Sequence, residues 1–437
     1  MTGERHFKAI LILLFSFLFT LSSFAVDKNT AQQIEEEIEK HRAEIIKIRR
    51  FIHMNPELSN REEETAKLVS SKLTSLGMEV RTGIAKTGVV GLLHGHQPGA
   101  TIAIRADMDA LPIQELNEVP FKSLNPGVMH ACGHDVHTSI ALGTAMVLNA
   151  LKDKIKGNIK FIFQPAEEGP PEGEQGGAPL MIAEGVLENP PVRAIFGLHV
   201  WPENLGEVYF SPGAIMAGSD FFQITIKGKS AHGARPYEGV DAIALASQVI
   251  VVLQTIISRT VDPEDPVVIT VGKIEGGIRS NILAEKVVLE GTVRALSEAN
   301  RKRLPKLIEN LIKGIVHPFG GDYTLNYEQI NPPVYNHPEL AVNMLPTLKN
   351  LLGEENVKPL SPQLVSEDFA YYAQKIPGFL FFLGVKNPKQ QTAAPLHSPY
   401  FNPDERSIPL GIKLMSHLLL DCLEQQSALE ITVPKPN

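Results

Sequence analysis

Ile159-Lys-Phe-Ile-Phe-Gln-Pro-Ala-Glu-Glu-Gly169 joins an apolar run to a pair of carboxylates. The run Ile159–Phe163 is typical of a buried strand, and Gln164-Pro165 begins the turn that ends it. Working outward, we expect further strands at 88–94, 101–106 and 194–198, and helices at 31–53, 61–76, 136–152 and 177–187. Strands that alternate with helices in this way predict a three-layer α/β domain.

The order of elements changes near residue 217. The pattern from there predicts a strand (221–227), a long helix (241–258), two strands (267–273 and 286–294), a helix (297–316) and a last strand (323–329). That order is typical of a split βαβ, ferredoxin-like unit. The α/β pattern then returns with a helix at 338–352, a strand at 379–385 and a helix at 408–424. We therefore predict a catalytic domain (26–216 and 331–437) that is interrupted by an inserted α+β domain (217–330).

Composition excludes several classes of protein. The chain has 437 residues, of which 43% are hydrophobic and 21% charged, as in soluble globular proteins. Intrinsic disorder and a polytopic membrane protein are both excluded by this balance. The net charge is −8, whereas a nucleic-acid-binding protein usually carries a positively charged surface, so we expect no nucleic-acid partner.

The first 25 residues resemble an export signal. Arg5 and Lys8 precede the apolar run Ala9–Leu21, and Ser23-Phe24-Ala25 has the spacing of a cleavage site. We expect cleavage after Ala25 and a secreted or periplasmic protein. An uncleaved anchor is the alternative, although the run is shorter than the ~20 residues that span a bilayer. No later segment is expected to cross a membrane, so no stable membrane association should remain after cleavage.

The densest group of reactive side chains is Met129-His-Ala-Cys-Gly-His-Asp-Val-His137. Thiolate and neutral imidazole are ligands for zinc and similar ions, and Cys132-x-His134 can place both at one centre. Two alternatives stay open from this segment alone. One is a solvated polar loop around a buried thiol, and the other is a Cys–His nucleophile, which needs a base brought close by the fold.

Metal-competent side chains also follow three predicted strands. Glu167-Glu168, Asp107 with Asp109, and His199 each come directly after an apolar run. Ligands in α/β sheets bind at the carboxyl ends of strands, so these groups should converge. Adjacent carboxylates beside a metal can divide the work, one binding the ion and the other transferring a proton.

Four blocks together resemble metallopeptidase family M20, amidohydrolase branch. They are Arg105-Ala-Asp-Met-Asp-Ala-Leu-Pro112, Met129–His137, Gln164–Gly169 and Gly197-Leu-His199. That branch includes hippurate hydrolases, N-acyl-amino-acid amidohydrolases and auxin-conjugate hydrolases. The resemblance implies an enzyme that cleaves the amide between an acyl or aryl-acyl group and an amino acid. A dipeptidase or carboxypeptidase of the same family is the alternative, and a non-catalytic metal-dependent binding protein is a second one.

The resemblance also implies a centre of two divalent ions, zinc or manganese. Glu167 would act as general base and then general acid, and Asp109 and Asp107 would orient the ligands. Relatives in the wider family have His-x-Asp where this chain has Asp107-Met-Asp109, so His134 would replace the missing histidine. The implied metal ligands are Cys132, as the bridge, with His134, Glu168, His199 and His397.

The inserted domain resembles the lid and dimerisation segment of the family at Gly228-Lys-Ser-Ala-His-Gly233. By this resemblance His232 stabilises the oxyanion, often in the partner subunit's active site, and Asn281 holds the carboxylate of the substrate. A homodimer through the inserted domain is implied. His94 and His96 are expected on the surface, in a hairpin turn.

Overall fold

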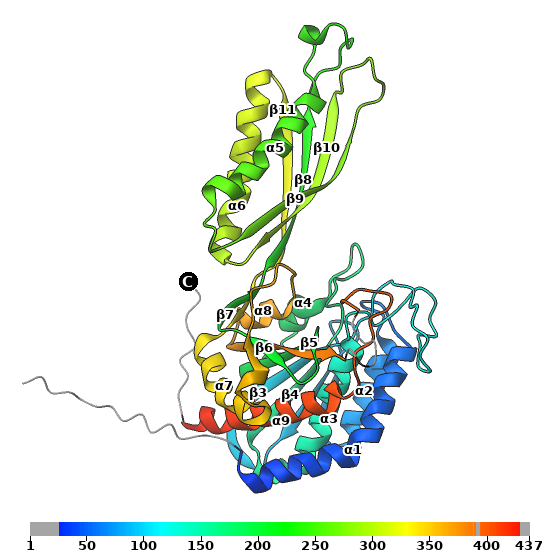
Figure 1. Ribbon diagram of the computed structural model, residues 1–437, viewed down its shortest axis with the longest axis vertical. Coiled ribbons are helices and arrows are strands. Elements are labelled where there is room, and N and C mark those ends of the chain that lie inside the picture. The colour runs from blue at the N-terminus through cyan, green and yellow to red at the C-terminus, as the bar shows by residue number, and fades with distance from the viewer. Residues whose placement is uncertain (1–25, 388, 390–393, 429–437) are drawn as a thin grey trace, which may run out of the picture.

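The computed structural model describes residues 26–387, 389 and 394–428, and it has two parts (Figure 1). The lower part contains an eight-stranded sheet with helices on both faces. The upper part is a four-stranded sheet covered by two long helices. The predicted leader, residues 1–25, lies outside the described residues.

The large sheet has the order β1-β2-β4-β3-β5-β14-β6-β13. Strand β3 runs parallel to both β4 and β5, and β5 runs parallel to β14. The carboxyl ends of these four neighbouring strands therefore meet at one edge of the sheet. The bounds are β1 (Glu79–Ile84), β2 (Gly88–His94), β3 (Gln97–Asp107), β4 (Lys156–Gln164), β5 (Val192–Asn204), β6 (Val208–Phe210), β13 (Val357–Pro359) and β14 (Gly378–Lys386). Beside it, β7 (Gly213–Met216) and β12 (Val334–Asn336) form a two-stranded sheet.

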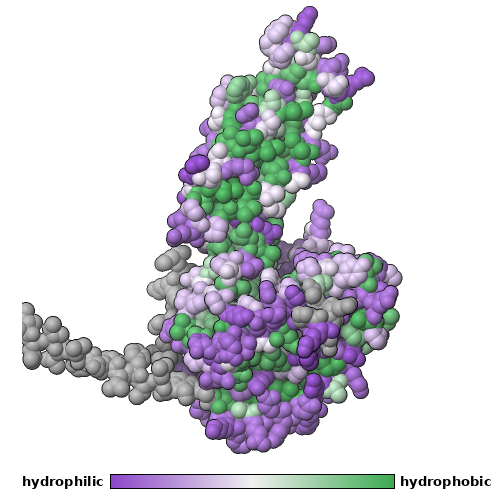
Figure 2. All heavy atoms as spheres, in the orientation of Figure 1, coloured by the Kyte–Doolittle hydropathy of each residue, from purple (hydrophilic) through white to green (hydrophobic). Residues whose placement is uncertain are grey.

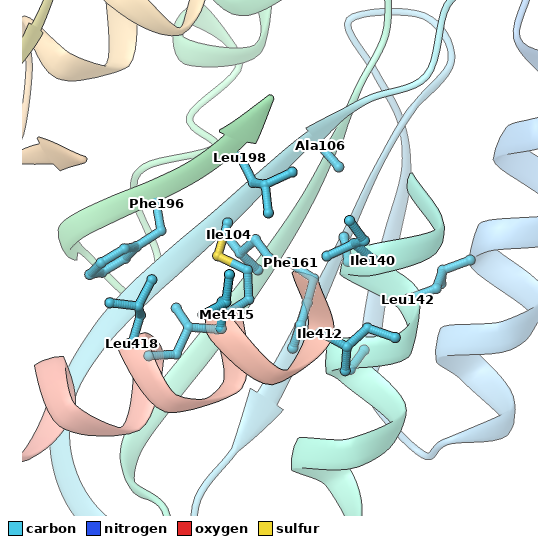
Figure 3. Packing of buried hydrophobic residues seen from close by; sticks show 14 of the residues in the cluster. Ile104, Ala106, Ile140, Leu142, Phe161, Phe196, Leu198, Ile412, Met415 and Leu418 are labelled. Atoms are coloured by element: carbon cyan, nitrogen blue, oxygen red, sulfur yellow. The ribbon is translucent and has the colours of Figure 1, made fainter. Parts of the chain in front are cut away.

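Helices cover both faces of the large sheet, as parallel strands require. Helices α1 (Lys28–Met54), α2 (Glu63–Ser75), α3 (His134–Ala150), α7 (Pro338–Leu352) and α9 (Ser407–Ala428) share one hydrophobic core. Helices α4 (Gly177–Ala183) and α8 (Phe369–Ala373) pack on the opposite face. In Figure 3, Met415 of α9 and Ile140 of α3 point toward Ile104 and Leu198 on the strands. This packing holds the strand ends and the start of α3 in fixed positions.

The small sheet has the antiparallel order β11-β8-β10-β9. Its elements are β8 (Gly218–Lys227), α5 (Ala242–Thr260), β9 (Val267–Gly276), β10 (Lys286–Ala295), α6 (Glu298–Val316) and β11 (Asp322–Asn331). One end of the sheet, where Gly218 pairs with Ala295, adjoins the large part, and the other end carries the loop after Lys227 (Figure 1). The predicted class, an α/β catalytic domain with an inserted α+β unit, is confirmed, whereas the exact domain boundaries stay a prediction.

Helix α5 contradicts the expectation that no later segment is apolar enough to cross a membrane. Among the described helices it alone meets that criterion by length and composition, with a mean hydropathy of 1.7. Leu245, Val249 and Leu253 pack against the small sheet, while Ile243 and Val251 are exposed. The helix is therefore apolar on both sides, and Figure 2 shows apolar residues over this part of the molecule.

Two helix caps are not those that the local sequence suggests. Asp27, rather than Asn29 or Thr30, caps α1, because its carboxylate accepts hydrogen bonds from both of those amides. Ser59 and Glu62 do not form the capping box that their spacing suggests for α2, and Glu62 makes no side-chain cap bond. Both side chains are used in the strand-end cluster described below.

The predicted hairpin at His94 and His96 is also absent. Strands β2 and β3, which this turn joins, are not paired, because β4 lies between them. Both histidines are exposed, as expected.

Candidate metal centre and active site

Three adjacent strands, in the order β4-β3-β5, bring the predicted residues together. Asp107 is the last residue of β3, and Glu167 and Glu168 follow the end of β4. His199 lies inside β5 rather than after it, since that strand continues to Asn204 and pairs His199 with Phe382. The predicted convergence of these side chains at one sheet edge is what the structure shows.

Cys132 and His134 are placed by Gly133 at the start of α3. Gly133 is the helix N-cap and has a left-handed backbone with φ 87°. A Cβ atom there would lie 2.4 Å from Cγ2 of Val200, so only glycine fits. Both flanking side chains are buried, which excludes the alternative of a solvated polar loop.

The sulfur of Cys132 is the shared atom of the cluster. It lies 3.5 Å from Nε2 of His199 and 3.4 Å from Nε2 of His397. Nε2 of His397 is in turn 3.2 Å from Oε1 of Glu168. Two groups with ligand atoms close enough to hold an ion therefore meet at one thiol: Cys132 with His134 and His199, and Cys132 with Glu168 and His397.

The cluster contains an unpartnered atom that a cation would satisfy. Nε2 of His134 is buried and has no hydrogen-bond partner among the described residues, an arrangement that is costly unless another group contacts it. Nδ1 of His199 donates to the carbonyl of Val200, which leaves Nε2 as a lone-pair donor toward the sulfur. Thiolate, imidazole and carboxylate together suit a divalent transition metal.

The surroundings of Cys132 argue against a Cys–His nucleophile. Burial raises the pKa of the Cys132 thiol well above its ordinary value, and the charges of Glu168 and Glu167 raise it further. A catalytic thiol needs the opposite shift. A bound cation, by contrast, deprotonates a coordinating thiol.

Asp109 orients two of the predicted ligands. Its Oδ1 is 3.1 Å from Nδ1 of His134, and its Oδ2 accepts hydrogen bonds from the amide of Glu168 at 3.0 Å and the hydroxyl of Ser59 at 2.8 Å. Burial alone would raise the pKa of Asp109, but the His134 contact outweighs it and the pKa is lowered. Burial likewise opposes charge on His134, and the carboxylates of Asp107 and Asp109 overcome it, raising its pKa to about 10.

Asp107 is held by His137 and Arg105. Nδ1 of His137 lies 2.6 Å from Oδ1 of Asp107, and the other ring nitrogen accepts the amide of Val200 at 2.8 Å. Asp107, His134 and His137 lie close enough to hold an ion, but both nitrogens of His137 are occupied. His137 therefore packs behind the candidate ligands.

Arg105 links the cluster to two carboxylates that sequence reasoning missed. Its guanidinium donates to Oε1 of Glu367 at 2.8 Å and Oδ1 of Asp368 at 2.6 Å, as well as to Asp107 at 2.7 Å. Glu367 and Asp368 precede α8 in a loop with no strand pattern before it, so nothing local marked them. A signal was available in Arg105 itself, a charged residue inside an apolar strand, because such a charge needs buried partners.

Glu62 is a second residue that was misread from the sequence. Its Oε1 accepts the amides of Asn60 at 3.0 Å and Ala166 at 2.9 Å. Ala166 has a positive φ of 52°, which is unusual for a residue with a side chain and turns the chain directly before Glu167. Glu62 thus supports the strained turn that aims Glu167 into the site.

Glu167 lies beside the candidate ligands at a carboxylate-rich position, with 8% of its side chain exposed. Its Oε2 is 3.8 Å from Nε2 of His134. Burial raises the pKa of Glu167 well above its ordinary value, and the neighbouring charges of Glu367 and Glu168 add to the effect. A carboxyl with a raised pKa next to a metal-competent cluster is suited to carry protons in both directions.

Two hollows open onto these residues. A cleft of about 900 Å³ is lined by Glu167, Glu168 and His397 from the large part and by Ser219 and Arg294 from the small sheet. An adjoining pocket of about 320 Å³ contains Cys132 and His199 at one side, and its apolar wall includes Trp201, Met216 and Leu396. The site therefore offers two compartments that share these residues: a larger cleft with charged and polar groups among apolar ones, and a smaller pocket that is mostly apolar.

His232 and Asn281 lie away from this site in the same chain. Both are exposed and adjacent, since the amide of Gly233 donates to the carbonyl of Asn281 at 2.8 Å. They sit at the far end of the small sheet (Figure 1), beyond the ten residues of β8. A strand of that length spans about 30 Å at roughly 3.3 Å per residue, which separates them from the cluster.

The chain matches the description "Peptidase family M20/M25/M40" over residues 103–421. It is 41% identical over 386 residues to the putative amidohydrolase YhaA of Bacillus subtilis, covering 88% of this chain and 96% of that protein. It is 43% identical over 311 residues to an N-acyl-L-amino acid amidohydrolase of Geobacillus stearothermophilus (71% and 82%). The thermostable carboxypeptidase 2 of Saccharolobus solfataricus is 39% identical over 396 residues (90% and 96%).

A solved structure agrees with the fold and the chemistry of the cluster. The Bacillus subtilis YXEP protein, described as a dinuclear metal binding peptidase from the M20 family, superposes with a TM-score of 0.76 at 33% identity. The match covers 91% of this chain and 99% of that one. The family predicted from the four sequence blocks is confirmed.

Proposed function

The chain belongs to peptidase family M20/M25/M40, and we propose that it is a metal-dependent amidohydrolase that splits N-acyl or aryl-acyl amino acids into a carboxylic acid and a free amino acid. One observation carries this proposal. Glu167, a largely enclosed carboxyl with a raised pKa, lies with its Oε2 3.8 Å from Nε2 of His134, beside two candidate ligand groups that share Cys132. A binding protein would need the ligands but no proton carrier, so the non-catalytic alternative is set aside.

We propose that Cys132, which both ligand groups share, would help to hold both ions of a two-ion centre, with His134, His199, Glu168 and His397 as the other ligands. Divalent cations held there would polarise the scissile carbonyl and acidify water. The thiol and imidazoles favour zinc, and the surrounding carboxylates tolerate manganese. The shared sulfur and the unpartnered Nε2 of His134 support this assignment.

Glu167 takes the proton from the attacking water and then gives it to the leaving amine. The carboxylates of Glu367 and Glu168 favour its protonated form after the first step, so the proton is retained until the amine leaves. Asp109 and Asp107 keep the His134 ring in place, and Glu62 holds the turn before Glu167. Glu167 is therefore the proton carrier, and the five other carboxylates raise its pKa, orient His134 or hold the turn.

The two compartments suit the two halves of an N-acyl amino acid. Trp201, Met216 and Leu396 offer an apolar wall to an acyl or aryl group. In the larger cleft the guanidinium of Arg294 donates to the hydroxyl of Ser366 at 2.9 Å, and no carboxylate pairs with Arg294 among the described residues. Arg294 is placed to receive the carboxylate of the amino acid, and Arg294→Ala should raise KM for such substrates far more than it lowers kcat.

His232 would complete the site from a second subunit. Its position at the far end of the small sheet prevents it from serving the site of its own chain, whereas a dimer formed through that sheet could present it to the partner. Exposed apolar residues on α5 and β9 favour such a homodimer, namely Ile243, Val251, Val268 and Ile274. Asn281, which lies beside His232, would enter the partner's site with it.

A dipeptidase or carboxypeptidase activity is the second candidate, because a carboxypeptidase is among the relatives. The two activities differ in the group that would enter the smaller pocket: a peptide substrate would bring polar or charged atoms there, and an N-acyl amino acid would bring an acyl group. The apolar wall at Trp201, Met216 and Leu396 favours an acyl group. Hydrolysis of benzoylglycine and N-acetyl amino acids, compared with unblocked dipeptides, separates the two activities.

Two neighbouring substitutions test the proposed mechanism. Glu167→Gln should keep two metal ions per chain and lose about 10²–10⁴ in kcat, because a general base is removed. Glu168→Gln should lose metal, because an amide is a poorer ligand, and added metal should restore part of the activity. If added metal instead rescued Glu167→Gln and left Glu168→Gln inactive, the two roles would have to be exchanged.

We further propose that the protein is exported and that residues 1–25 are removed. The support is the basic residues, apolar run and small-residue cleavage pattern of the leader. N-terminal sequencing of protein from the native host should find Val26, and recovery of intact Met1 in the cytosol would refute the proposal.

A further inference from the structure

The backbone nitrogen of Val26 is bound to a buried carboxylate. It lies 3.0 Å from Oδ1 of Asp421, a residue 395 positions later in the chain. Asp421 lies in α9 and is 1% exposed. Its other oxygen accepts the hydroxyl of Thr347 from α7 at 2.5 Å. One carboxylate thus joins the start of α1 to two helices of the main core.

Asp421 lacks a basic side chain as partner, within the part of the chain that the structure describes. The charged groups around it are engaged elsewhere: Lys156 with Glu424, Lys154 with the hydroxyl of Thr30, and Asp153 with His96. Asp27, next to Val26, accepts the amides at the start of α1. Burial, opposed in part by the bonds from Thr347 and Val26, raises the pKa of Asp421 to about 6. An isolated buried carboxylate of this kind is costly unless a cation approaches it.

Removal of residues 1–25 would create that cation at the backbone nitrogen of Val26. Water and a signal-cleaving peptidase split the Ala25–Val26 bond, Ala25 leaves as a carboxylate, and the nitrogen of Val26 becomes a primary ammonium at neutral pH. This is the same nitrogen that already lies 3.0 Å from Asp421. We propose that Asp421 is a binding site for the α-ammonium of mature Val26, so that export processing locks the N-terminus into the core.

The surroundings of Val26 suit a charged chain end. A cavity of about 550 Å³ adjoins it, lined by Asp27, Asp153 and Glu424 as well as by two lysines. The side chain of Val26 packs against the main hydrophobic core, which orients the nitrogen toward α9. A cation before the first turn of α1 is disfavoured by the helix dipole, and the carboxylates of Asp421 and Asp27 offset that repulsion.

The site rests on the proposed cleavage after Ala25, but its test does not depend on enzymatic activity. Protein that begins at Val26 is prepared from a fusion whose protease leaves no extra residue, and a second form carries Gly-Ala before Val26. Both are made with Asp421 and with Asp421→Asn, which is nearly isosteric and still accepts hydrogen bonds. Asp153→Asn is the matched control, because Asp153 lines the same cavity but pairs with His96.

With Asp421 present, the free terminus should raise Tm by at least about 2 °C over the extended form. Asp421→Asn should abolish this difference and Asp153→Asn should preserve it. The ammonium pair raises the folded pKa of the amine above the ordinary ~7.7–8.0. The difference should therefore be complete near pH 7, disappear as pH rises through that raised pKa, and disappear again in acid as Asp421 becomes protonated.

A second measurement uses the folded protein with Asp421 intact. Acylation of the α-amine at pH 7.5 should be at least tenfold slower than in Asp421→Asn, because an ammonium does not react. Equal acylation rates in these two proteins, or a free-terminus effect on Tm that survives Asp421→Asn, would overturn the proposal. N-terminal sequencing that finds a different cleavage site would refute cleavage after Ala25, and with it the locking of the mature terminus, while leaving the Tm result on prepared protein unchanged.

Discussion

The single methyl group added by Gly133→Ala should damage both stability and metal binding. Gly133 has φ 87°, and the left-handed region costs a residue with a side chain about 1–2 kcal/mol. The added Cβ would also lie 2.4 Å from Cγ2 of Val200, an overpacked contact that typically costs about 1–3 kcal/mol. The two terms together predict a loss of about 2–5 kcal/mol in the free energy of unfolding.

Gly77→Ala is the matched control for the backbone term. Gly77 also has a positive φ, 75°, and a Cβ there would meet nothing within 4 Å. It should lose only about 1–2 kcal/mol. Urea unfolding of the metal-free proteins gives the two free energies, and elemental analysis of the purified proteins gives the metal content.

The metal content of the two variants tests whether Gly133 sets the positions of Cys132 and His134. Cys132 and His134 flank Gly133, so a shift of this turn moves two ligands of the cluster at once. Gly133→Ala should therefore bind less metal than the wild type, whereas Gly77→Ala should bind the full amount. Equal losses of stability in the two variants, with full metal in both, would show that Gly133 does not set the position of the ligands.

Three further outcomes follow from the same structure. Arg105→Leu leaves Asp107, Glu367 and Asp368 buried without their cation and should cost about 3–5 kcal/mol in urea unfolding, whereas a loss below 1 kcal/mol would mean that water reaches them. In the metal-free protein, burial and the charge of Asp109 raise the pKa of Glu62 to about 7. The contribution of Glu62 to the free energy of unfolding is therefore complete below pH 4.5 and is lost as the pH rises through 7. Glu62→Gln should therefore gain about 3 kcal/mol relative to wild type between pH 4.5 and 8, and a pH-independent difference would contradict this. His232→Ala should lose about 10²–10³ in kcat, and mixing it with Glu167→Gln should restore activity. In a symmetric dimer each hybrid contains one complete site, so random exchange should give about a quarter of wild-type activity. No recovery after verified exchange would exclude a role of His232 in the partner's site.

The chemistry of the cluster could be read locally because it follows strand ends. Asp107, Glu167 and His199 each stand at or near the carboxyl side of an apolar run, and parallel strands bring such positions to one edge. The spacing in Cys132-Gly-His134 likewise placed two candidate ligands on either side of a helix start. These features depend on the periodicity of short segments, which the sequence contains directly.

Residues whose role depends on a distant partner were missed or misread. Ser59 and Glu62 have the spacing of a capping box, yet their side chains bind Asp109 and the amide of Ala166. The first turn of α2 is capped instead by Glu57, whose carboxylate accepts the amides of Glu64 and Thr65, so Glu62 can satisfy the buried amide of Ala166, which would be costly to leave unpaired. No pattern within ten residues of Glu62 contains this information.

The class of fold, the family and the chemistry of the candidate ligands could be inferred from the sequence, because strand and helix periods and the motif blocks are local. Which groups meet became visible in three dimensions: the β4-β3-β5 order, the contact between Cys132 and His397 across 265 positions, and the bond from Val26 to Asp421. The fold also separates His232, which follows the ten residues of β8, from the cluster of its own chain, although both belong to one predicted mechanism. Strand order and helix packing are set by burial of the whole core, and no single segment encodes that burial.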